Sequence, residues 1–304
     1  MSRHRLIAAD WGTTNLRAFR LAADGRVVER RDAPAGILNV PEGRFEDAFD
    51  QALGDWLAAW PAAPVVLSGM IGSRQGWRES PYVDCPAGAP EIAARAVPIT
   101  SGSGRQVWIL PGLVVRDPGG TPDVMRGEET QILGAFEGAA GDRRLCCLPG
   151  THSKWALIED GRILGFRTAM TGEVFATLIR HSILGRLIEG EEHHAEAFDR
   201  GLGRADEPGG LLHHLFGTRS LGLTGELPPA ALASYLSGIL IGHDVSHGPA
   251  AVPGEAPIVL VGAGALTERY ARAFERRGRT AIVIDGASAA ARGLWRLGRL
   301  MFEA

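Results

Sequence analysis

The one lysine of this chain is a candidate for a residue with a chemical role. Lys and Arg together number 32, and Lys154, in the stretch Leu-Pro-Gly-Thr-His-Ser-Lys-Trp at 148–155, is the one lysine among them. An ammonium is a compact point charge, whereas a guanidinium is a planar fork. A lysine beside a Gly-Thr turn therefore suggests an oxyanion site where backbone N–H groups, hydroxyls and a small cation converge. A lysine on the outer face of its strand, with its ammonium in water, is the alternative.

A second turn of this kind lies near the N-terminus, in Asp-Trp-Gly-Thr-Thr-Asn at 10–15. Both turns offer backbone amides and hydroxyls without bulky side chains, which suits a cluster of phosphate oxygens. Asp10 follows a predicted buried strand, and its carboxylate is a ligand that Mg²⁺ takes together with phosphate oxygens. The pattern GxxxxGK[ST] is absent from the sequence. The sequence therefore indicates a phosphate site that is not of the P-loop type.

Matching strands are predicted to position the two turns. Each turn lies between two strands, and an Asp-Gly pair, at 24–25 and at 160–161, then leads into a third. The predicted strands are 5–10, 16–21 and 26–31 in the first copy, and 144–148, 154–159 and 162–168 in the second. The recurrence of both turns at matched offsets indicates an internal duplication.

The remaining pattern predicts a mixed α/β chain in two lobes. Lobe one, 1–118, also contains a helix at 42–60 and strands at 64–68 and 107–110, and the Pro- and Gly-rich stretch 111–123 is interpreted as the crossing. Lobe two, 119–304, contains helices from 127, 171, 190, 208, 228, 265 and 287, and strands at 257–261 and 280–284. The last helix is expected to pack back toward lobe one.

Composition excludes several classes of protein. With 304 residues and 45% hydrophobic content, the chain can bury two cores. A net charge of −3 favours neither nucleic acid nor an anionic membrane as a partner. The cysteines show no zinc spacing, and no apolar run reaches membrane-spanning length, so a cytoplasmic protein is expected. The histidine pairs 193–194 and 213–214 lack a third ligand spacing and are expected to be solvated.

Six ordered motifs then resemble a known family. "DWGTTNLRAF" and "PGTHSKW" are similar to the two phosphate motifs of the actin/hexokinase/Hsp70-type ATPase superfamily, and "IVLVGAGALTERYARAF" at 258–274 is similar to its adenosine motif. Together with "SGMIGSRQGW", "MRGEETQILGA" and "RTAMTGE", they resemble 2-dehydro-3-deoxygalactonokinases from about residue 5 to residue 298. The resemblance implies a two-lobed, actin-like α/β fold of duplicated ribonuclease H-like halves, with a nucleotide cleft between the lobes.

The resemblance also implies a reaction: phosphorylation of 2-dehydro-3-deoxy-D-galactonate by ATP to its 6-phosphate, in D-galactonate catabolism, with Mg²⁺ as the metal. Asp10 is the expected metal ligand, and Lys154 is expected to act in catalysis. The nucleotide would be held by a set drawn from the phosphate and adenosine motifs: Asp10, Gly12, Thr13, Thr14, Asn15, Gly150, Thr151, Gly262 and Gly264.

The expected catalytic base is one of two adjacent glutamates. In related sugar kinases an acidic residue in a Gly-acid-helix context takes the hydroxyl proton, and this role carries over to Glu128, which follows Gly127, ahead of Glu129. On a helix the two side chains point about 100° apart, so at most one faces the cleft. Acidic residues in a first helical turn also stabilise the helix dipole, which is the structural alternative for both.

The acceptor is a sugar acid, and its carboxylate is expected to meet an arginine or a nest of backbone amides. The candidates lie in the motifs around the two turns and after the predicted strand at 64–68: Arg17, Ser68, Gly69, Ser73, Arg74, Arg126 and Thr171. Thr171 either lines the acceptor pocket or caps the helix that begins there.

Other activities remain open at this point. They are a superfamily phosphatase or ATPase of the exopolyphosphatase kind, a nucleotide switch acting through partners, and a kinase for a related keto-deoxy sugar acid. The "SGMIGSRQGW" stretch favours a kinase, since a hydrolase needs no sugar-recognition loop. A homodimer is left open.

Overall fold

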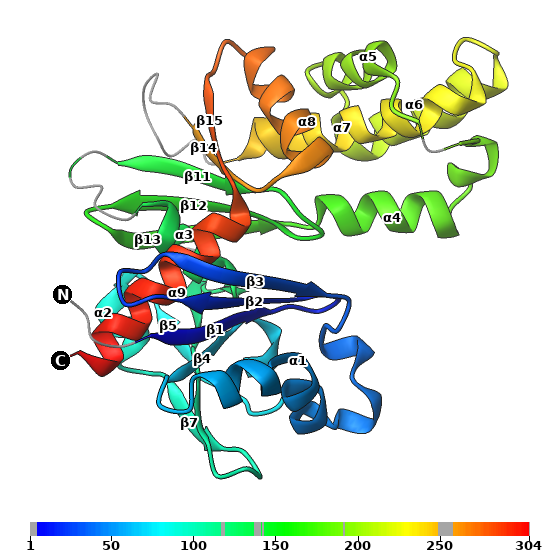
Figure 1. Ribbon diagram of the computed structural model, residues 1–304. Coiled ribbons are helices and arrows are strands. Elements are labelled where there is room, and N and C mark those ends of the chain that lie inside the picture. Colours follow the sequence, from blue (N-terminus) through cyan, green and yellow to red (C-terminus); the bar gives the residue numbers. More distant parts are fainter. Residues whose placement is uncertain are drawn as a thin grey trace. The chain divides into compact units, whose positions relative to one another are not determined.

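The computed structural model describes residues 5–116, 119–136, 141, 143–190, 192–248 and 258–303. Their contacts divide the chain into two compact units, which Figure 1 shows. The first unit comprises Met1–Cys146, Ala156–Phe166 and Ile284–Ala304, and the second comprises Cys147–Trp155 and Arg167–Val283. These units group residues by packing. The lobe boundary at residue 118 refers to the halves of the duplication, and it stays a prediction.

The first unit is built on a six-stranded sheet with the order β3-β2-β1-β4-β8-β7. Its strands are β1 (Leu6–Trp11), β2 (Leu16–Leu21), β3 (Val27–Ala33), β4 (Val65–Ser68), β7 (Val97–Thr100) and β8 (Gln106–Ile109). The hairpins β1-β2 and β2-β3 are antiparallel, whereas β4 runs parallel to β1 and β8 parallel to β4. The predicted first meander is confirmed.

Helix α1 (Phe45–Ala59) covers this sheet with one apolar face. Phe49, Leu53 and Trp56 recur at helical spacing and are at most 1% exposed. They join the buried strand residues in one core. The predicted helix at 42–60 is confirmed, with its start three residues later.

The stretch 111–123, interpreted as the crossing between the lobes, overlaps two strands that were not predicted. These are β9 (Gly112–Arg116) and β10 (Pro122–Met125), which form a three-stranded sheet with β5 (Tyr82–Asp84) in the order β10-β9-β5. The run Leu-Val-Val at 113–115 has strong strand propensity and pairs with β10 on one side and β5 on the other. The short α2 (Ala89–Ala93) and the two-residue β6 (Ala87–Gly88) were not predicted either.

The second sheet of six strands repeats the first. Its order is β15-β14-β11-β12-β13-β6, with β11 (Arg144–Leu148), β12 (Ser153–Glu159), β13 (Arg162–Ala169), β14 (Ile258–Val261) and β15 (Ala281–Ile284). Read from the third strand of each meander, the orders β3-β2-β1-β4-β8 and β13-β12-β11-β14-β15 are equivalent. The predicted duplication and the mixed α/β fold class are therefore confirmed.

Five helices belong to the second unit: α4 (Thr171–His181), α5 (Ala195–Ala205), α6 (Gly210–Leu223), α7 (Leu232–His247) and α8 (Gly264–Glu275). Helix α7 is its centre, since it is buried along most of its length. Gly201 of α5 and Gly238 of α7 allow the two backbones to touch: a Cβ on Gly238 would lie 2.2 Å from the Phe198 carbonyl oxygen. Larger residues at these positions would push the two helices apart.

Helices α3 (Glu128–Ala135) and α9 (Gly286–Phe302) pack together in the first unit, and α9 also contacts β1, β2 and β4. Gly134 and Gly293 lie at their crossing, where a Cβ on Gly293 would be 1.8 Å from the Thr130 carbonyl oxygen. This close crossing fixes the start of α3 beside the sheet. No helix among the described residues is both long and apolar enough to cross a membrane.

Candidate active site

Three backbone segments of the first unit converge on the Asp10 carboxylate. Asp10 lies near the carboxyl end of β1, in register with Ser68 of β4. Gly69 follows β4 with φ of 93°, and Gly127 precedes α3 with φ of 109°. A Cβ on Gly69 would lie 2.8 Å from the Trp11 carbonyl oxygen, and one on Gly127 would lie 3.1 Å from the Gly69 Cα. Glycine at both positions is therefore what brings the backbone up to the carboxylate.

Burial dominates the electrostatics of the Asp10 carboxylate. Its pKa is raised from 3.8 to about 6, mainly by burial; the charge of Arg17 lowers the pKa, the nearby Glu128 carboxylate raises it, and a hydrogen bond from Gln131 lowers it. The Arg17 Nη1 lies 3.9 Å from Asp10 Oδ2, and Gln131 Nε2 donates to the same oxygen at 3.3 Å. An added cation would stabilise the ionised form of this pair of carboxylates.

The first turn presents its side chains to solvent. Thr13, Thr14 and Asn15 are exposed. The backbone of the turn is held from behind, because Gly36 N–H donates to the Thr14 carbonyl at 3.0 Å and Ile37 N–H donates to the Gly12 carbonyl at 3.0 Å. The hydroxyls are thus outward on a fixed backbone, as a phosphate cradle requires.

The two adjacent glutamates have opposite environments. Glu129 is fully buried: Gly127 N–H donates to its Oε2 at 2.7 Å, and Thr130 Oγ1 donates to its Oε1 at 3.2 Å. Burial, followed by the charge of Glu128, raises the pKa of Glu129 to about 8. Glu128 is half-buried, and its Oε2 accepts from the Arg126 N–H at 3.0 Å. Of the two, Glu128 is therefore the one with access to solvent beside Asp10.

Three of the predicted acceptor residues, Ser68, Arg74 and Ser73, have different surroundings. The fully buried Ser68 hydroxyl lies 2.8 Å from Thr130 Oγ1, so it is directed into the protein. Arg74 is 88% exposed, with its Nε 3.7 Å from Glu79. Half-buried Ser73 keeps its hydroxyl oxygen inside the protein, with no hydrogen-bond partner among the described residues. Ser68 therefore lies beside Asp10 with its hydroxyl turned away, whereas Arg17 and Gly69 are the predicted acceptor residues that approach the Asp10 carboxylate.

Arg126 is occupied by a structural cluster. Its guanidinium donates to the Ser80 carbonyl at 2.9 Å and to the Ser80 hydroxyl, and it lies over the Tyr82 ring at 4.4 Å from the centroid. The side chain is only 7% exposed. Arg126 thus anchors the segment before α3, and through its own N–H it also orients Glu128.

The second unit assembles the other predicted motifs around its own turn. A Cβ on Gly172, in the first turn of α4, would lie 2.6 Å from the Gly150 carbonyl oxygen, and the Glu173 N–H donates to the Thr151 carbonyl at 3.0 Å. A Cβ on Gly262, after β14, would lie 3.9 Å from Pro149. The second phosphate motif, the "RTAMTGE" motif and the adenosine motif therefore meet within this unit.

For both Lys154 and Thr171, the structure excludes one of the two alternatives that the sequence left open. Lys154 is 5% exposed, so the alternative with its ammonium in water is wrong. Thr171 does not cap α4, because the residue before the helix is Met170 and the Thr171 hydroxyl instead donates to Asp244 Oδ2 at 2.7 Å. A buried carboxylate is a stronger acceptor for this hydroxyl than the competing backbone contacts. Gly264, with φ of 70°, begins α8.

One of the histidines expected in solvent is buried. His214 is fully buried, with Nδ1 2.9 Å from His243 Nε2 and Nε2 3.2 Å from the Pro208 carbonyl oxygen. Helix α6 turns this residue inward, while its neighbour His213 is exposed. Among the described residues, no group of three or more His, Cys, Asp or Glu side chains is arranged to hold a metal ion.

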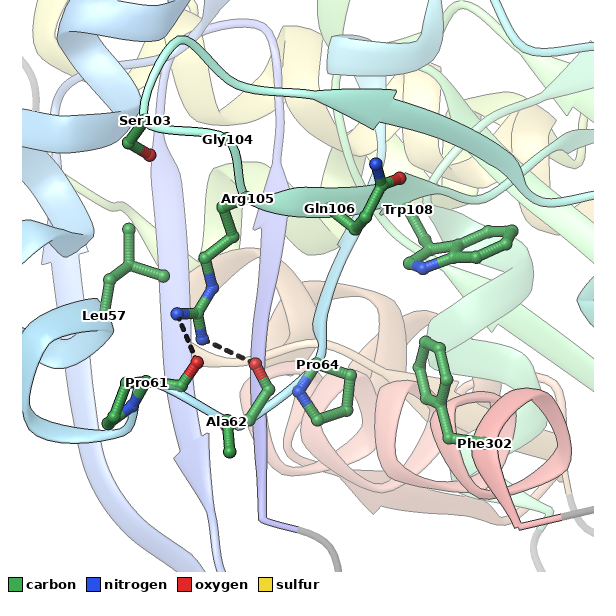
Figure 2. A pocket seen from close by; sticks show the side chains of 11 residues that line it. Leu57, Pro61, Ala62, Pro64, Ser103, Gly104, Arg105, Gln106, Trp108 and Phe302 are labelled. Carbon is green, nitrogen blue, oxygen red and sulfur yellow. Dashed lines mark hydrogen bonds between the residues drawn. The ribbon is translucent and has the colours of Figure 1, made fainter.

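A pocket of about 770 Å³ in the first unit lies apart from these residues (Figure 2). It is lined where β4 and β8 begin, whereas Asp10 lies where the parallel β1 ends, so the two are at opposite edges of the sheet. Arg105, at its wall, donates to the carbonyls of Trp60, Pro61 and Ala63. Its guanidinium therefore caps the segment after α1 and is not directed to a ligand.

Sequence reasoning missed two polar residues of these sites, Gln131 and Asp244. Gln131 was not singled out because the two glutamates that precede it in α3 were the stronger candidates for a catalytic role. Asp244 had a usable signal: it is the one acidic residue in the mostly apolar run 232–245 of α7, and a buried carboxylate requires hydrogen-bond donors around it.

Known proteins are similar to this chain over most of its length. The model of the family described as 2-keto-3-deoxy-galactonokinase matches residues 10–297. A probable 2-dehydro-3-deoxygalactonokinase of Rhizobium meliloti (strain 1021) is 38% identical over 301 residues, covering 95% of this chain and 97% of the relative. The 2-dehydro-3-deoxygalactonokinase of Escherichia coli (strain K12) is 36% identical over 290 residues, covering 95% and 96%.

A solved structure agrees with these sequence matches. A crystal structure from Sinorhizobium meliloti, provisionally named as a 2-dehydro-3-deoxygalactonokinase, is 36% identical, with a TM-score of 0.88 over 98% of this chain and 100% of that one. Matches of this length and identity show that the chain belongs to the 2-keto-3-deoxy-galactonokinase family and is a phosphotransferase with an alcohol group as acceptor.

Proposed function

We propose that this enzyme transfers the γ-phosphoryl group of ATP to the 6-hydroxyl of 2-dehydro-3-deoxy-D-galactonate. The observation that carries the proposal is the neighbouring pair of carboxylates, Asp10 and Glu128, beside a turn with outward threonine hydroxyls. A sugar kinase needs one acidic group for the metal and another for the accepting hydroxyl. The names of the two curated relatives support the choice of acceptor.

Glu128 is the proposed base. The acceptor oxygen attacks the γ-phosphorus, the bond from that phosphorus to the β–γ bridging oxygen breaks, and the hydroxyl proton passes to the Glu128 carboxylate. Glu129 is unsuited to this role, since it is fully buried and its pKa of about 8 keeps it mostly protonated at neutral pH. Phosphoryl transfer depends largely on positioning, so Glu128 also orients the hydroxyl.

Asp10 fits the requirements of a Mg²⁺ site. Its pKa of about 6 reflects burial next to a second carboxylate, which is a local excess of negative charge that a divalent cation would offset. Bound Mg²⁺ would neutralise charge on the phosphate oxygens. Gln131, which donates to Asp10 Oδ2, orients this carboxylate.

The second unit supplies the proposed contacts to the nucleotide. Backbone amides at Gly150 and Thr151 are suited to phosphate oxygens, and the turn from Gly262 to Gly264 opens α8, whose N-terminus favours negative charge. Lys154 is proposed to stabilise the transferring phosphoryl group or the acceptor carboxylate. Arg17 and Gly69 are the best-placed of the proposed acceptor residues, because both lie beside Asp10.

The test is ADP release with Mg²⁺-ATP in the presence and absence of 2-dehydro-3-deoxygalactonate. We expect turnover that depends on the acceptor, and a product phosphorylated at the 6-position. The matching gluconate-derived acid, which differs at one hydroxyl centre, is the control for acceptor specificity. Equal ADP release without acceptor would identify a hydrolase instead. A homodimer stays a prediction, which sedimentation of the purified protein tests.

A further inference from the structure

Asp244, near the end of α7, is the acceptor of four hydrogen bonds from three other elements of the second unit. Its Oδ2 accepts from the hydroxyls of Ser153, at 2.6 Å, and Thr171, at 2.7 Å, and from the hydroxyl of Tyr270. Its Oδ1 accepts from Trp155 Nε1 at 2.8 Å. The donors belong to β12, α4 and α8. This carboxylate is 7% exposed.

Neutral donors alone surround this carboxylate. Among the described residues, Asp244 forms no salt bridge, so its charge is stabilised by hydrogen bonds. Burial, followed by the charge of Asp244, raises the pKa of Tyr270, so that hydroxyl stays protonated and donates. Hydrogen bonds to a charged acceptor are about twice as strong as neutral ones. A group with four of them holds its partners in one arrangement.

The contacts from β12 orient the proposed catalytic lysine. Ser153 and Trp155 are two residues apart and therefore project from one face of the strand, toward Asp244. Lys154 lies between them and projects from the opposite face. The turn at 150–151 immediately precedes this segment. Asp244 thus fixes the strand that determines where both the turn and the lysine point.

The contact from α4 fixes the other side of the same turn. Thr171 is the first residue of α4, and the next residue, Gly172, packs against the Gly150 carbonyl and the Thr151 Cα. The space between Gly172 and the turn has no room for a Cβ, because a Cβ on Gly172 would lie 2.6 Å from the Gly150 carbonyl oxygen. A shift of Thr171 would therefore be transmitted directly to the turn.

The contact from α8 brings in the third motif. Tyr270 lies one and a half turns into the helix that Gly264 begins, and it is 1% exposed. Through this one hydroxyl, Asp244 is joined to the segment that resembles the adenosine motif. The same carboxylate therefore links all three motifs that meet in the second unit.

We propose that Asp244 is a positioning residue that sets the geometry of the second phosphate turn and of Lys154 for binding and transfer of the ATP phosphates. The inference rests on the proposed function, because it assigns ATP to this turn. It predicts that loss of any one of the four hydrogen bonds raises the KM for ATP.

The experiment uses conservative single variants of the full chain. Thr171→Val and Tyr270→Phe each remove one hydroxyl, and Asp244→Asn keeps the shape but replaces one acceptor oxygen by a donor. For each we expect the KM for ATP to rise about tenfold, which is the loss of one hydrogen bond to a charged group. In Tyr270→Phe the KM for the acceptor should stay within about twofold, since Tyr270 is not one of the proposed acceptor residues.

Matched controls separate positioning from plain stability. Thr218→Val removes a fully buried hydroxyl that has no partner among the described residues, and Tyr235→Phe removes a buried hydroxyl of α7 outside the Asp244 cluster. Both should keep the wild-type KM for ATP. All assays are run well below the melting temperature of each variant. Wild-type kinetics in Thr171→Val and Tyr270→Phe, with only a lower Tm, would overturn the proposal and leave Asp244 a structural residue.

Direct binding distinguishes failure of this inference from failure of the proposed function. Calorimetric titration with Mg²⁺-ATP alone, without any acceptor, should show the same roughly tenfold weakening in Thr171→Val. If the wild type binds ATP but phosphorylates no sugar acid, the proposed acceptor is wrong and the titration still tests Asp244. If the variants bind ATP as tightly as an active wild type, the inference about Asp244 is wrong.

Discussion

The two glycine-threonine turns occupy equivalent places in equivalent sheets, yet their charges differ. The first follows Asp10, and its surroundings include Arg17 and the acidic start of α3. The second follows the apolar Leu148 and carries the buried Lys154. The carboxylate that supports this segment, Asp244, belongs to α7 and accepts hydrogen bonds from residues of the same unit.

Under the proposed function, the two duplicated halves have different roles. The backbone course is common to both, so each half offers amides and hydroxyls to an anion. Side chains at the strand ends differ: the first half presents carboxylates suited to a cation and a proton, and the second presents a cation and neutral donors suited to phosphate. Substitutions in each half should therefore damage different steps.

The largest effect is expected in the first half, for Asp10→Asn. Removing this carboxylate should lower kcat/KM about a thousandfold or more, because several kcal/mol of metal-dependent charge stabilisation are lost. Steady-state kinetics at saturating Mg²⁺-ATP measure the effect. Asp32→Asn is the control, since Asp32 also pairs with Arg17 but is exposed. A near wild-type rate for Asp10→Asn would mean that the metal site is misassigned.

The next largest effect is expected in the second half, for Lys154→Met. If the ammonium stabilises developing charge, kcat/KM should fall by an amount equivalent to about 2–4 kcal/mol. Lys154→Arg keeps the charge, but the buried space suits a compact ammonium better than a planar fork, so it should also lose kcat or raise the KM for one anionic ligand. An Arg variant indistinguishable from wild type would leave the lone lysine without a functional explanation.

A smaller loss is expected for Glu128→Gln. A missing general base typically costs about a hundredfold or more in kcat, while nucleotide affinity should be unchanged because Glu128 contacts the acceptor. Glu129→Gln is the matched neighbour, and its effect on kcat should be small. The reverse pattern, with the loss in Glu129→Gln, would transfer the catalytic role to the buried residue.

The smallest effect concerns stability and not rate. The pKa of Glu129 is about 8 in the folded protein against 4.5 for the unperturbed group, so between these values the folded state binds more protons. The free energy of unfolding therefore falls as pH rises through this window, and Asp10, with a pKa raised from 3.8 to about 6, adds a fall of the same sign at lower pH.

Glu129→Gln should remove the fall between pH 6 and 8 and retain that contributed by Asp10 below about pH 6. The slope lost is at most about 1.4 kcal/mol per pH unit, the value for one proton. Urea denaturation at several pH values measures both profiles. Parallel profiles for wild type and variant would show that Glu129 does not carry the pH dependence.

The sequence by itself determined the two meanders and their turns, because strand alternation and Asp-Gly hairpins are local signals. The predicted strands 16–21 and 144–148 coincide with β2 and β11. It also placed Asp10 at a strand end and Glu128 at a helix start. These positions follow from neighbours in the chain.

Only the tertiary structure decided what surrounds those residues. Glu129 is buried and Glu128 is not because the packing of α3 against the sheet and α9 selects one face of the helix. Asp244 accepts a hydrogen bond from Ser153, which is 91 positions away in the sequence. The strands at 112–116 and 122–125 belong to a three-stranded sheet whose pairing the local sequence pattern does not predict. Burial and long-range hydrogen bonds depend on which segments meet in space, and periodicity along the chain does not carry that information.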